Sequence, residues 1–321
     1  MDKLKYNTIW IAQRADPYVY RHKDGSYYFT ASLPEYDGIT LRKATSLDEL
    51  PQAQEVRIWN KHETGPMSFH VWAPELHYIN QTWYIYFAAG EVEDIWKIRP
   101  YVLECTGQDP MNDLWIERGM MQCAKEDEFS FRAFSLDATV FENKGKYYMV
   151  WAEKVSVGKQ ISNLYLAQME SPTQLKTVQV LLTTPDYDWE RKGFWVNEGP
   201  SVIHNNHKIY LTYSASETGI DYCIGMLSID EDADLLDPKA WKKERYPVLC
   251  SDEKKGIYGP GHNSFTKDSN GNDIMVYHAR TETEIEGNPL YNPNRHAMLM
   301  KVLWDKEGKP VFEYQSEDEV S

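Results

Sequence analysis

Cysteine is scarce in this chain of 321 residues, and its four copies are far apart. Cys105, Cys123, Cys223 and Cys250 form no CxxC pair, so we expect neither a zinc site nor a disulfide framework. The first residues contain no apolar core of signal-peptide length, and no run approaches the roughly 20 apolar residues that span a bilayer. These absences predict a soluble, reduced, cytoplasmic protein with no membrane partner.

Positive charge is also in deficit. The chain has 34 Lys and Arg against 49 Asp and Glu, a formal net charge of −15. Binding to phosphates needs a basic surface, so nucleic acid and anionic membranes are excluded as partners. The glycine-rich segment 256–261 lacks the Lys-Ser/Thr of a phosphate-binding loop, which argues against a nucleotide site.

Helix signals are few, and aromatic residues are abundant. Only Ser46–Leu50 and Asp237–Lys243 are expected to form short turns of helix. The chain contains 22 Tyr, 11 Trp and 10 Phe. Short aromatic and β-branched runs alternate with Gly, Asn and Asp turns, which is typical of an all-β protein. Five runs of this kind are Tyr27–Thr30, Trp83–Phe87, Tyr147–Trp151, Ile209–Tyr213 and Ile274–Tyr277.

A long repeat underlies these runs. Each one follows a polar residue, a first strand and a hairpin turn, and the polar residues are Asp16, Glu75, Asp137, Glu198 and His262. Their spacings of 59, 62, 61 and 64 residues allow four strands in each unit. The repeat predicts a single domain over residues 1–321, a five-bladed β-propeller. A β-sandwich with similar hairpins is the alternative.

The polar residues suggest chemistry because equivalent positions of propeller blades converge at one end of the central channel. Four carboxyl groups placed close together repel one another unless catalysis or a bound cation requires them. Glycoside hydrolysis requires such a set. One carboxylic acid protonates the leaving oxygen, and a carboxylate activates water or attacks the sugar. A further acid can keep its neighbour protonated.

Several motifs together carry a resemblance to a known family. They are Ala15-Asp16-Pro17, Trp72-Ala73-Pro74-Glu75, Ser135-Leu136-Asp137-Ala138, Asn197-Glu198-Gly199-Pro200, Gly259-Pro260-Gly261-His262 and His278-Ala279-Arg280. This set resembles family 43 of the glycoside hydrolases from about residue 12 to about residue 305. The resemblance implies a five-bladed propeller that hydrolyses arabinosides and xylosides with inversion.

The resemblance also implies roles for individual residues. Asp16 matches the general base, Glu198 the general acid, and Asp137 the acid that tunes the pKa of Glu198 and orients the substrate. His262 matches a histidine that helps to hold a hydrated cation, often calcium, and no cofactor is required for the chemistry. Either Arg280 or Arg295 matches the arginine that contacts the sugar.

Further residues are expected to form the pocket and to contact the substrate. They are Trp72, Glu75 and the long segments Glu91–Phe134 and Thr281–Asn294, which carry Trp96, Arg99, Trp115 and Tyr291. Glu75 is expected to be structural or to support the site, and not to act as a fourth catalytic acid.

The expected substrates are neutral arabino-oligosaccharides, because the net charge of −15 would repel acidic pectin. The resemblance favours exo-acting release of terminal α-L-arabinofuranosyl units from α-1,5 linkages, as in arabinan degradation. A β-xylosidase is the alternative enzyme, and a non-catalytic carbohydrate-binding propeller is the alternative from a different class.

Overall fold

The chain folds almost entirely into β-strands. The computed structural model describes residues 4–157 and 159–314, and within them the only helices are two 3₁₀ turns, η1 (Leu50–Gln52) and η2 (Asp188–Glu190). Of the two short helical turns expected, Ser46–Leu50 is a turn that leads into η1 at Leu50. Asp237–Lys243 is a turn that ends in a short strand, because so short a segment does not sustain a helix. In this described part, no helix has the length and apolar character needed to cross a bilayer.

The first two sheets are antiparallel and contain strands in chain order. The first consists of β2 (Ala15–Arg21), β3 (Tyr27–Ser32), β4 (Gly38–Ala44) and β5 (Glu55–Asn60). The second consists of β6 (Phe69–Ile79), β7 (Thr82–Glu91), β8 (Asp94–Cys105) and β9 (Trp115–Met120).

The middle of the chain forms a larger sheet from two antiparallel groups. The first group contains β10 (Ser135–Asn143), β11 (Lys146–Val157), β12 (Lys159–Ser171), β13 (Gln174–Leu175) and β14 (Val180–Thr183). The second contains β15 (Trp195–Asn205), β16 (Lys208–Ala215), β17 (Cys223–Asp230) and β18 (Lys242–Lys243). A short parallel pairing between β12 and β15 joins the two groups.

The last sheet pairs a strand from the beginning of the chain with strands from its last third. It contains β19 (Tyr258–Lys267), β20 (Asp273–Arg280), β21 (His296–Lys301) and the N-terminal β1 (Ile9–Ile11). A separate hairpin of β22 (Leu303–Trp304) and β23 (Pro310–Val311) follows.

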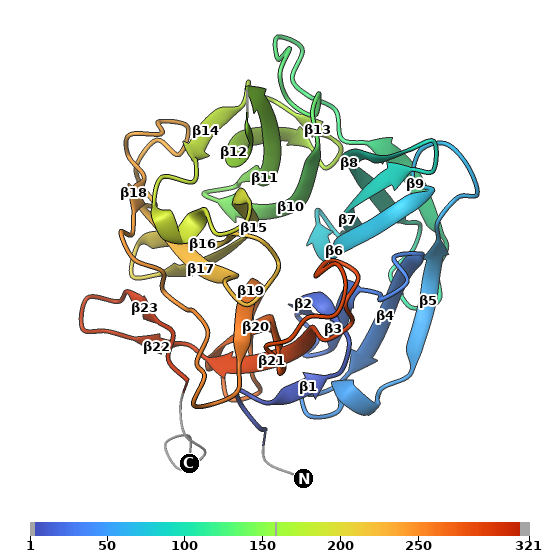
Figure 1. Ribbon diagram of the computed structural model, residues 1–321. Helices are drawn as coiled ribbons and strands as arrows, with labels where there is room; N and C mark the ends of the chain where they lie inside the picture. The colour runs from blue at the N-terminus through green and yellow to red at the C-terminus, as the bar shows by residue number, and fades with distance from the viewer. Residues whose placement is uncertain (1–3, 158, 315–321) are drawn as a thin grey trace.

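These groups surround a common centre (Figure 1). The first strand of each group, namely β2, β6, β10, β15 and β19, lies nearest the centre and contacts the next, and β19 contacts β2. This arrangement differs from two sheets stacked face to face, so the β-sandwich alternative is set aside.

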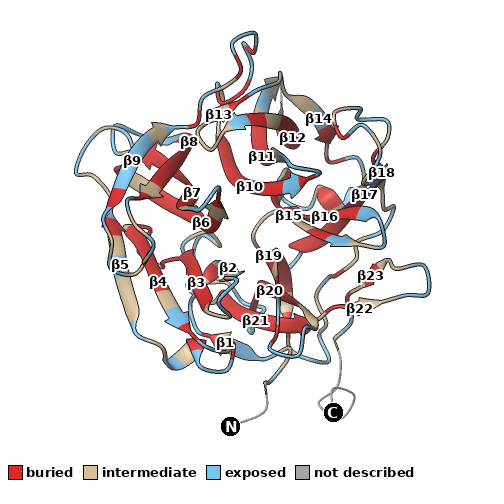
Figure 2. Ribbon diagram, turned by 180° about the vertical axis from the view of Figure 1, so that it is seen from behind, coloured by how far each residue is buried: buried red, intermediate tan, exposed pale blue. Residues whose placement is uncertain are grey.

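The predicted aromatic runs lie in the second strand of each group, and these strands are largely buried. Figure 2 shows this as the red colour of β7, β11 and β16. Trp83, Trp151, Tyr213 and Tyr277 have 1% exposure or less. They pack with aliphatic residues of neighbouring groups, as Tyr277 does with Ile224 and Ile203. The core therefore lies between adjacent sheets and fixes the inner strands around the centre.

Each innermost strand contains a β-bulge near its beginning. Pairing with the second strand shifts after Ala15, Trp72, Leu136, Glu198 and Gly261. The next residue has a positive φ in every case: Asp16 (53°), Ala73 (47°), Asp137 (54°), Gly199 (53°) and His262 (42°). A bulge redirects a side chain out of the regular alternation.

The bulges correct the predicted equivalence of five ionisable residues. Asp16, Asp137 and His262 occupy the same position, whereas the corresponding residues of β6 and β15 are Ala73 and Gly199. Glu198 precedes its bulge residue by one position, and Glu75 follows its own by two. The spacing of the repeat therefore agrees with the prediction, but Glu75 and Glu198 are not at the position that corresponds to Asp16, Asp137 and His262.

Candidate active site

A cavity of about 800 Å³ lies where the innermost strands begin. Every one of these strands contributes to its lining, through Asp16, Trp72, Asp137, Glu198 and His262. A cavity of this size and mixed polarity is typical of a small-molecule site. The three predicted acids and the predicted histidine thus come together.

Asp16 and Asp137 share one neighbour that can carry a positive charge. Nδ1 of His262 lies 3.2 Å from Oδ1 of Asp16 and 3.7 Å from Oδ2 of Asp137. Burial alone would lower the pKa of His262, but the charges of Asp16 and Asp137 raise it above its usual value. The geometry therefore favours an imidazolium between two carboxyl groups.

Asp16 is held in its charged form. Burial alone would raise its pKa, but the positive charges of His262 and Arg295 bring it well below the usual range. Ser32 Oγ donates to Oδ2 of Asp16 over 2.5 Å, and the backbone N–H of Asp16 donates to Nδ1 of His278 over 3.1 Å. Burial lowers the pKa of His278 to about 4, so this imidazole is neutral and can accept.

Asp137 and Glu198 have the opposite tendency. Burial raises the pKa of Asp137 to about 8; His262 opposes the shift, and repulsion from Glu198 reinforces it. Burial also raises the pKa of Glu198, with repulsion from Asp16 adding to the effect and the Tyr222 hydrogen bond partly offsetting it. A charge on either carboxyl disfavours ionisation of the other, so the pair retains a proton near neutral pH.

Both of these carboxyl groups have fixed partners. The backbone N–H of Gly199 donates to Oδ2 of Asp137 over 3.0 Å. The hydroxyl of Tyr222 donates to Oε1 of Glu198 over 2.8 Å, and its ring stacks on His278 with centroids 5.7 Å apart. The site therefore places an ionised carboxylate and a protonated carboxyl group around one cavity.

One wall of the cavity is aromatic, and two predicted segments meet in it. Trp72 and Trp96 both line the cavity, as predicted for Trp72 and for the segment 91–134. The ring of His70 stacks on Trp72 with centroids 4.3 Å apart. His70 also contacts the carbonyl of Ile95 at 2.9 Å and the hydroxyl of Tyr291 at 2.8 Å, and it thereby joins the two segments.

Three of the four residues predicted for the walls do not line the cavity, namely Tyr291, Arg99 and Trp115. Arg99 donates to the carbonyls of Ile98 and Arg132. Trp115 is buried against its own sheet and donates to the carbonyl of Pro110 over 3.0 Å. Both stabilise the segment 91–134 instead of forming the surface of the pocket.

The two candidate arginines occupy different places. Arg295 lines the cavity and donates to the hydroxyl of Tyr36 and to the carbonyl of Leu290. Arg280 does not line it. Arg280 is 1% exposed and donates to the carbonyls of Thr218 and Pro289 at 2.8 and 2.7 Å. Its predicted contact with sugar is corrected, because the guanidinium is occupied in holding two loops.

Glu75 also lies outside the cavity lining, which corrects its inclusion among the substrate-binding residues. It is 6% exposed, and its Oε2 lies 2.8 Å from Nε2 of His77. The physical reason is its position two residues beyond the bulge residue of β6. Its structural environment agrees with the expectation that Glu75 is not a fourth catalytic acid.

Direct metal binding does not fit the site. Among the described residues, no group of three or more His, Cys, Asp and Glu side chains is arranged to hold a metal ion. His262 directs Nδ1 at two carboxyl groups, and its raised pKa favours protonation, whereas a histidine ligand must be neutral. A hydrated cation contacted by His262 through water stays a prediction.

The sequence did not predict several residues of the site. Ser32 ends an aromatic strand, and Tyr222 lies in a loop outside the repeat, so neither position carries a periodic signal. Lys154 lines the cavity with Nζ 3.9 Å from the ring centroid of Phe134. Burial lowers the pKa of Lys154. Only its position three residues after the third aromatic run could have indicated it.

The cavity contains one ionised carboxylate and one protonated carboxyl group. Enzymes that hydrolyse glycosides by acid–base catalysis use such a pair, and the site is of this class. The chain belongs to the glycosyl hydrolases of family 43, whose sequence pattern matches residues 6–310. The resemblance found in the motifs is thereby confirmed.

Three similar proteins have names that specify an activity. An extracellular exo-α-(1→5)-L-arabinofuranosidase of Streptomyces avermitilis is 45% identical over 94% of this chain, which spans 61% of that relative. An enzyme of the same name from Streptomyces chartreusis is 46% identical, with 88% of this chain and 85% of the relative covered. The crystal structure of an α-L-arabinofuranosidase from Lactobacillus brevis is 47% identical and has a TM-score of 0.89, covering 97% of this chain and 98% of that chain.

The predicted cytoplasmic location is wrong. Both Streptomyces relatives are named as extracellular enzymes. The prediction relied on missing features, namely paired cysteines and an apolar N-terminal core, and such absences do not determine the compartment in which a protein works.

Proposed function

We propose that this chain is an inverting α-L-arabinofuranosidase that releases terminal arabinofuranosyl units from neutral arabino-oligosaccharides, with exo action on α-1,5 linkages. The names of the two Streptomyces relatives and of the Lactobacillus brevis structure support this substrate. The observation that carries the chemistry is the opposite pKa shift of two carboxyl groups, Asp16 and Glu198, in one cavity.

In the proposed mechanism, the Asp16 carboxylate removes a proton from the attacking water. Glu198 donates its proton to the oxygen of the departing sugar as the glycosidic bond breaks, and the water oxygen bonds to the anomeric carbon. An inverting pair requires about 6.5–9.5 Å between the two carboxyl groups, which leaves room for the water. Asp137 tunes the pKa of Glu198, because a charge on either carboxyl group disfavours ionisation of the other, and it orients the sugar. The reaction needs no cofactor.

The cavity walls support the proposed exo action. We propose that Trp72, Trp96 and Phe134, which line the cavity with their rings close together, close one side of it. Arg295 reaches the cavity beside Asp16. We assign to Arg295 the contact with the terminal sugar. A cavity closed on one side accepts a chain end, whereas an endo-acting enzyme requires an open groove along which a polymer can lie.

We also propose that residues 1–321 form one domain, a five-bladed β-propeller. The ring of contacts from β2 through β6, β10, β15 and β19 back to β2 supports this description. Pairing of β1 with β21 supports it further, because this pairing would close the ring between the first and last parts of the chain.

The decisive experiment is incubation with linear α-1,5-arabinotriose, linear arabinan, arabinoxylan and xylobiose, with products followed over time. We expect arabinose alone, released fastest from the trimer. Faster release of xylose from xylobiose would favour the β-xylosidase alternative, and early mixed oligomers from arabinan would indicate endo action. Binding of all four substrates without hydrolysis would favour the carbohydrate-binding alternative.

Two further measurements test the mechanism. NMR of the first product should show an inverted anomeric carbon, and retention would refute the assignment of Asp16 as base. Asp16→Ala should be nearly inactive on every substrate, whereas Glu198→Ala should retain activity on substrates with activated leaving groups, which need little protonation. If Asp16→Ala shows that pattern instead, the roles are reversed.

A further inference from the structure

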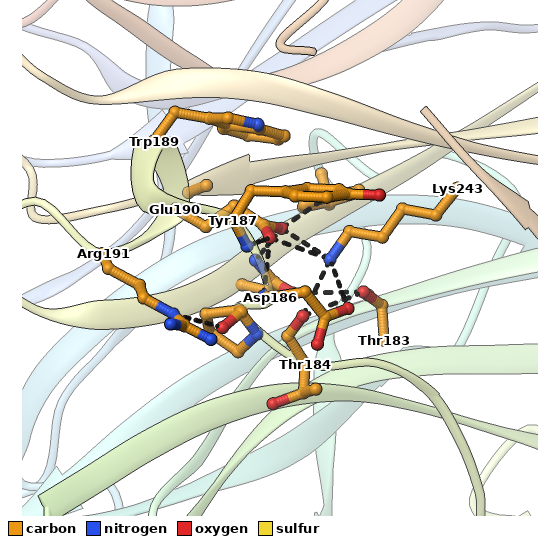
Figure 3. Close-up of polar contacts among 12 residues, drawn as sticks. Thr183, Thr184, Asp186, Tyr187, Trp189, Glu190, Arg191 and Lys243 are labelled. Carbon is orange, nitrogen blue, oxygen red and sulfur yellow. Dashed lines mark hydrogen bonds and ion pairs between the residues drawn. The ribbon is translucent and has the colours of Figure 1, made fainter. Parts of the chain in front are cut away.

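One buried carboxylate lies close to the site in sequence but outside the cavity. Glu190 belongs to η2, just before β15, and its side chain has 0% exposure. It accepts hydrogen bonds from five groups: the backbone N–H of Asp186 (2.7 Å) and of Tyr187 (2.9 Å), Asn197 Nδ2 (2.9 Å), Tyr213 OH (2.9 Å) and Lys243 Nζ (2.8 Å). Figure 3 shows Asp186, Tyr187 and Lys243 around Glu190.

These contacts make Glu190 a junction between four elements. Tyr213 belongs to β16, Lys243 to β18 and Asn197 to β15, while the backbone donors belong to the turn that contains η2. Lys243 also donates to the carbonyl of Thr184 over 2.8 Å. A buried carboxylate with all its acceptor sites filled is rigid, because moving it would leave several groups without partners.

Asn197 connects Glu190 to the site, because it is bonded to Glu190 and directly precedes Glu198. Its side chain is fully buried, donates to Glu190 through Nδ2 and accepts at Oδ1 from Thr183 Oγ1 over 3.3 Å. Successive residues of a strand point to opposite faces. When Asn197 points toward Glu190, the next residue, Glu198, therefore points into the cavity.

The other neighbour of Glu198 is anchored as well, since the N–H of Gly199 donates to Asp137. We infer that Glu190 is a positioning residue that, through Asn197, fixes the rotation of β15 and so the direction in which Glu198 presents its carboxyl group. This inference rests on the proposed role of Glu198 as general acid.

The test compares two substrates in the full-length enzyme, 4-nitrophenyl α-L-arabinofuranoside and α-1,5-arabinobiose. A displaced acid slows the natural linkage more, because only its poor leaving group needs full protonation. Glu190→Asp keeps the charge beside Lys243 and shortens the reach to Asn197. Asn197→Ala removes the link and leaves Glu190 its other partners. We divide kcat/KM for the nitrophenyl substrate by kcat/KM for arabinobiose. For both variants we expect this ratio to rise about tenfold or more.

The ratio does not depend on how much of the sample is folded, so a merely structural role would leave it unchanged. Asp268→Asn is the matched control. Asp268 is 8% exposed and accepts hydrogen bonds from the backbone N–H of Asn270 and of Asn272. It lies in the turn after β19, six residues beyond His262. We expect this variant to lose stability and keep the wild-type ratio.

Glu198→Ala separates failure of the inference from failure of the proposed function. If Glu198→Ala raises the ratio and both test variants keep the wild-type value, Glu190 is not a positioning residue and the inference is overturned. If Glu198→Ala itself keeps the wild-type ratio, the acid assignment fails, and the inference fails with it.

Discussion

Nδ1 of His262 lies 3.2 Å from Oδ1 of Asp16, and this ion pair sets the charge state of the whole site. It favours ionised Asp16, and it also limits the increase in the pKa of Asp137 and of Glu198. Removing one imidazole should therefore move all three carboxyl groups in the same direction.

His262→Gln should shift the whole pH profile of kcat/KM to higher pH. Without the positive charge the pKa of Asp16 rises, so the base becomes protonated at a higher pH and the acidic limb moves up. The pKa of Glu198 rises too, so the alkaline limb follows, and activity at the original optimum should fall about tenfold or more. A lower maximum of kcat/KM with both limbs at their wild-type pH values would contradict the predicted shift. His207→Gln, which alters a histidine whose side chain is 81% exposed, should leave the profile unchanged.

Tyr222→Phe should move only one limb. The Tyr222 hydroxyl stabilises ionised Glu198, so its loss raises the pKa of Glu198 and extends activity to higher pH. The acidic limb, set by Asp16, should stay in place. The same kcat/KM profile measures both limbs, and movement of the acidic limb alone would show that Tyr222 acts on the base. Tyr246→Phe, at a side chain that is 71% exposed, serves as the control.

Asp137→Asn should stabilise the fold at alkaline pH and reduce turnover. The pKa of Asp137 is about 8 in the folded protein, above its value in the unfolded chain, so the folded state binds its proton more tightly. Wild-type stability from this group is complete at acidic pH and is lost as pH rises toward 8. Asparagine does not titrate and can still accept from Gly199.

Thermal unfolding measures this difference. The Tm of Asp137→Asn should exceed that of the wild type by roughly a few degrees at pH 8 and by less at pH 5. An equal difference at both pH values would mean that the carboxyl is not held protonated by its surroundings.

The arginines should separate into one that supports the loops and one that acts in the site. Arg280→Met takes its donor away from the part-buried carbonyls of Thr218 and Pro289 and should cost about 2–4 kcal/mol of unfolding free energy in urea denaturation. Arg295→Met should reduce kcat/KM on arabinotriose about a hundredfold, because the terminal sugar is then misplaced. The opposite pattern, with Arg280→Met folding normally and losing catalysis, would return the sugar contact to Arg280.

Removal of divalent cations should leave most of the activity. His262 is paired with carboxyl groups, so any cation near it would be held through water and would be structural. Dialysis against chelator, followed by an assay with arabinotriose, tests this. Complete loss that only a transition metal restores would show that a metal takes part in the reaction.

Much of the fold could be predicted because one physical pattern recurs: a first strand, a hairpin turn and an aromatic strand that fills the space between sheets. The bulges explain the limit of that prediction. An extra residue in each first strand shifts the alignment by one or two positions, so Glu75 and Glu198 were equated with Asp16, although the bulge residues are Ala73 and Gly199.

The site was predictable where short motifs surround a bulge, as at Asp16, Asp137 and Glu198. It was not predictable where loops from distant parts of the chain meet. The choice between Arg280 and Arg295 depends on which carbonyls the loops present, and the contact of Tyr222 with Glu198 joins a loop to a different strand. Neither relationship leaves a periodic trace in the sequence.

The bulge of β6 has a consequence for engineering the enzyme. Ala73 has the same left-handed backbone as Asp16, Asp137 and His262, and its N–H donates to Ser32 Oγ, which in turn donates to Asp16. Alanine gains nothing from this conformation, whereas asparagine and aspartate tolerate it better. Position 73 is therefore a buried place where asparagine or aspartate would find the backbone already in a suitable conformation, linked through Ser32 to Asp16.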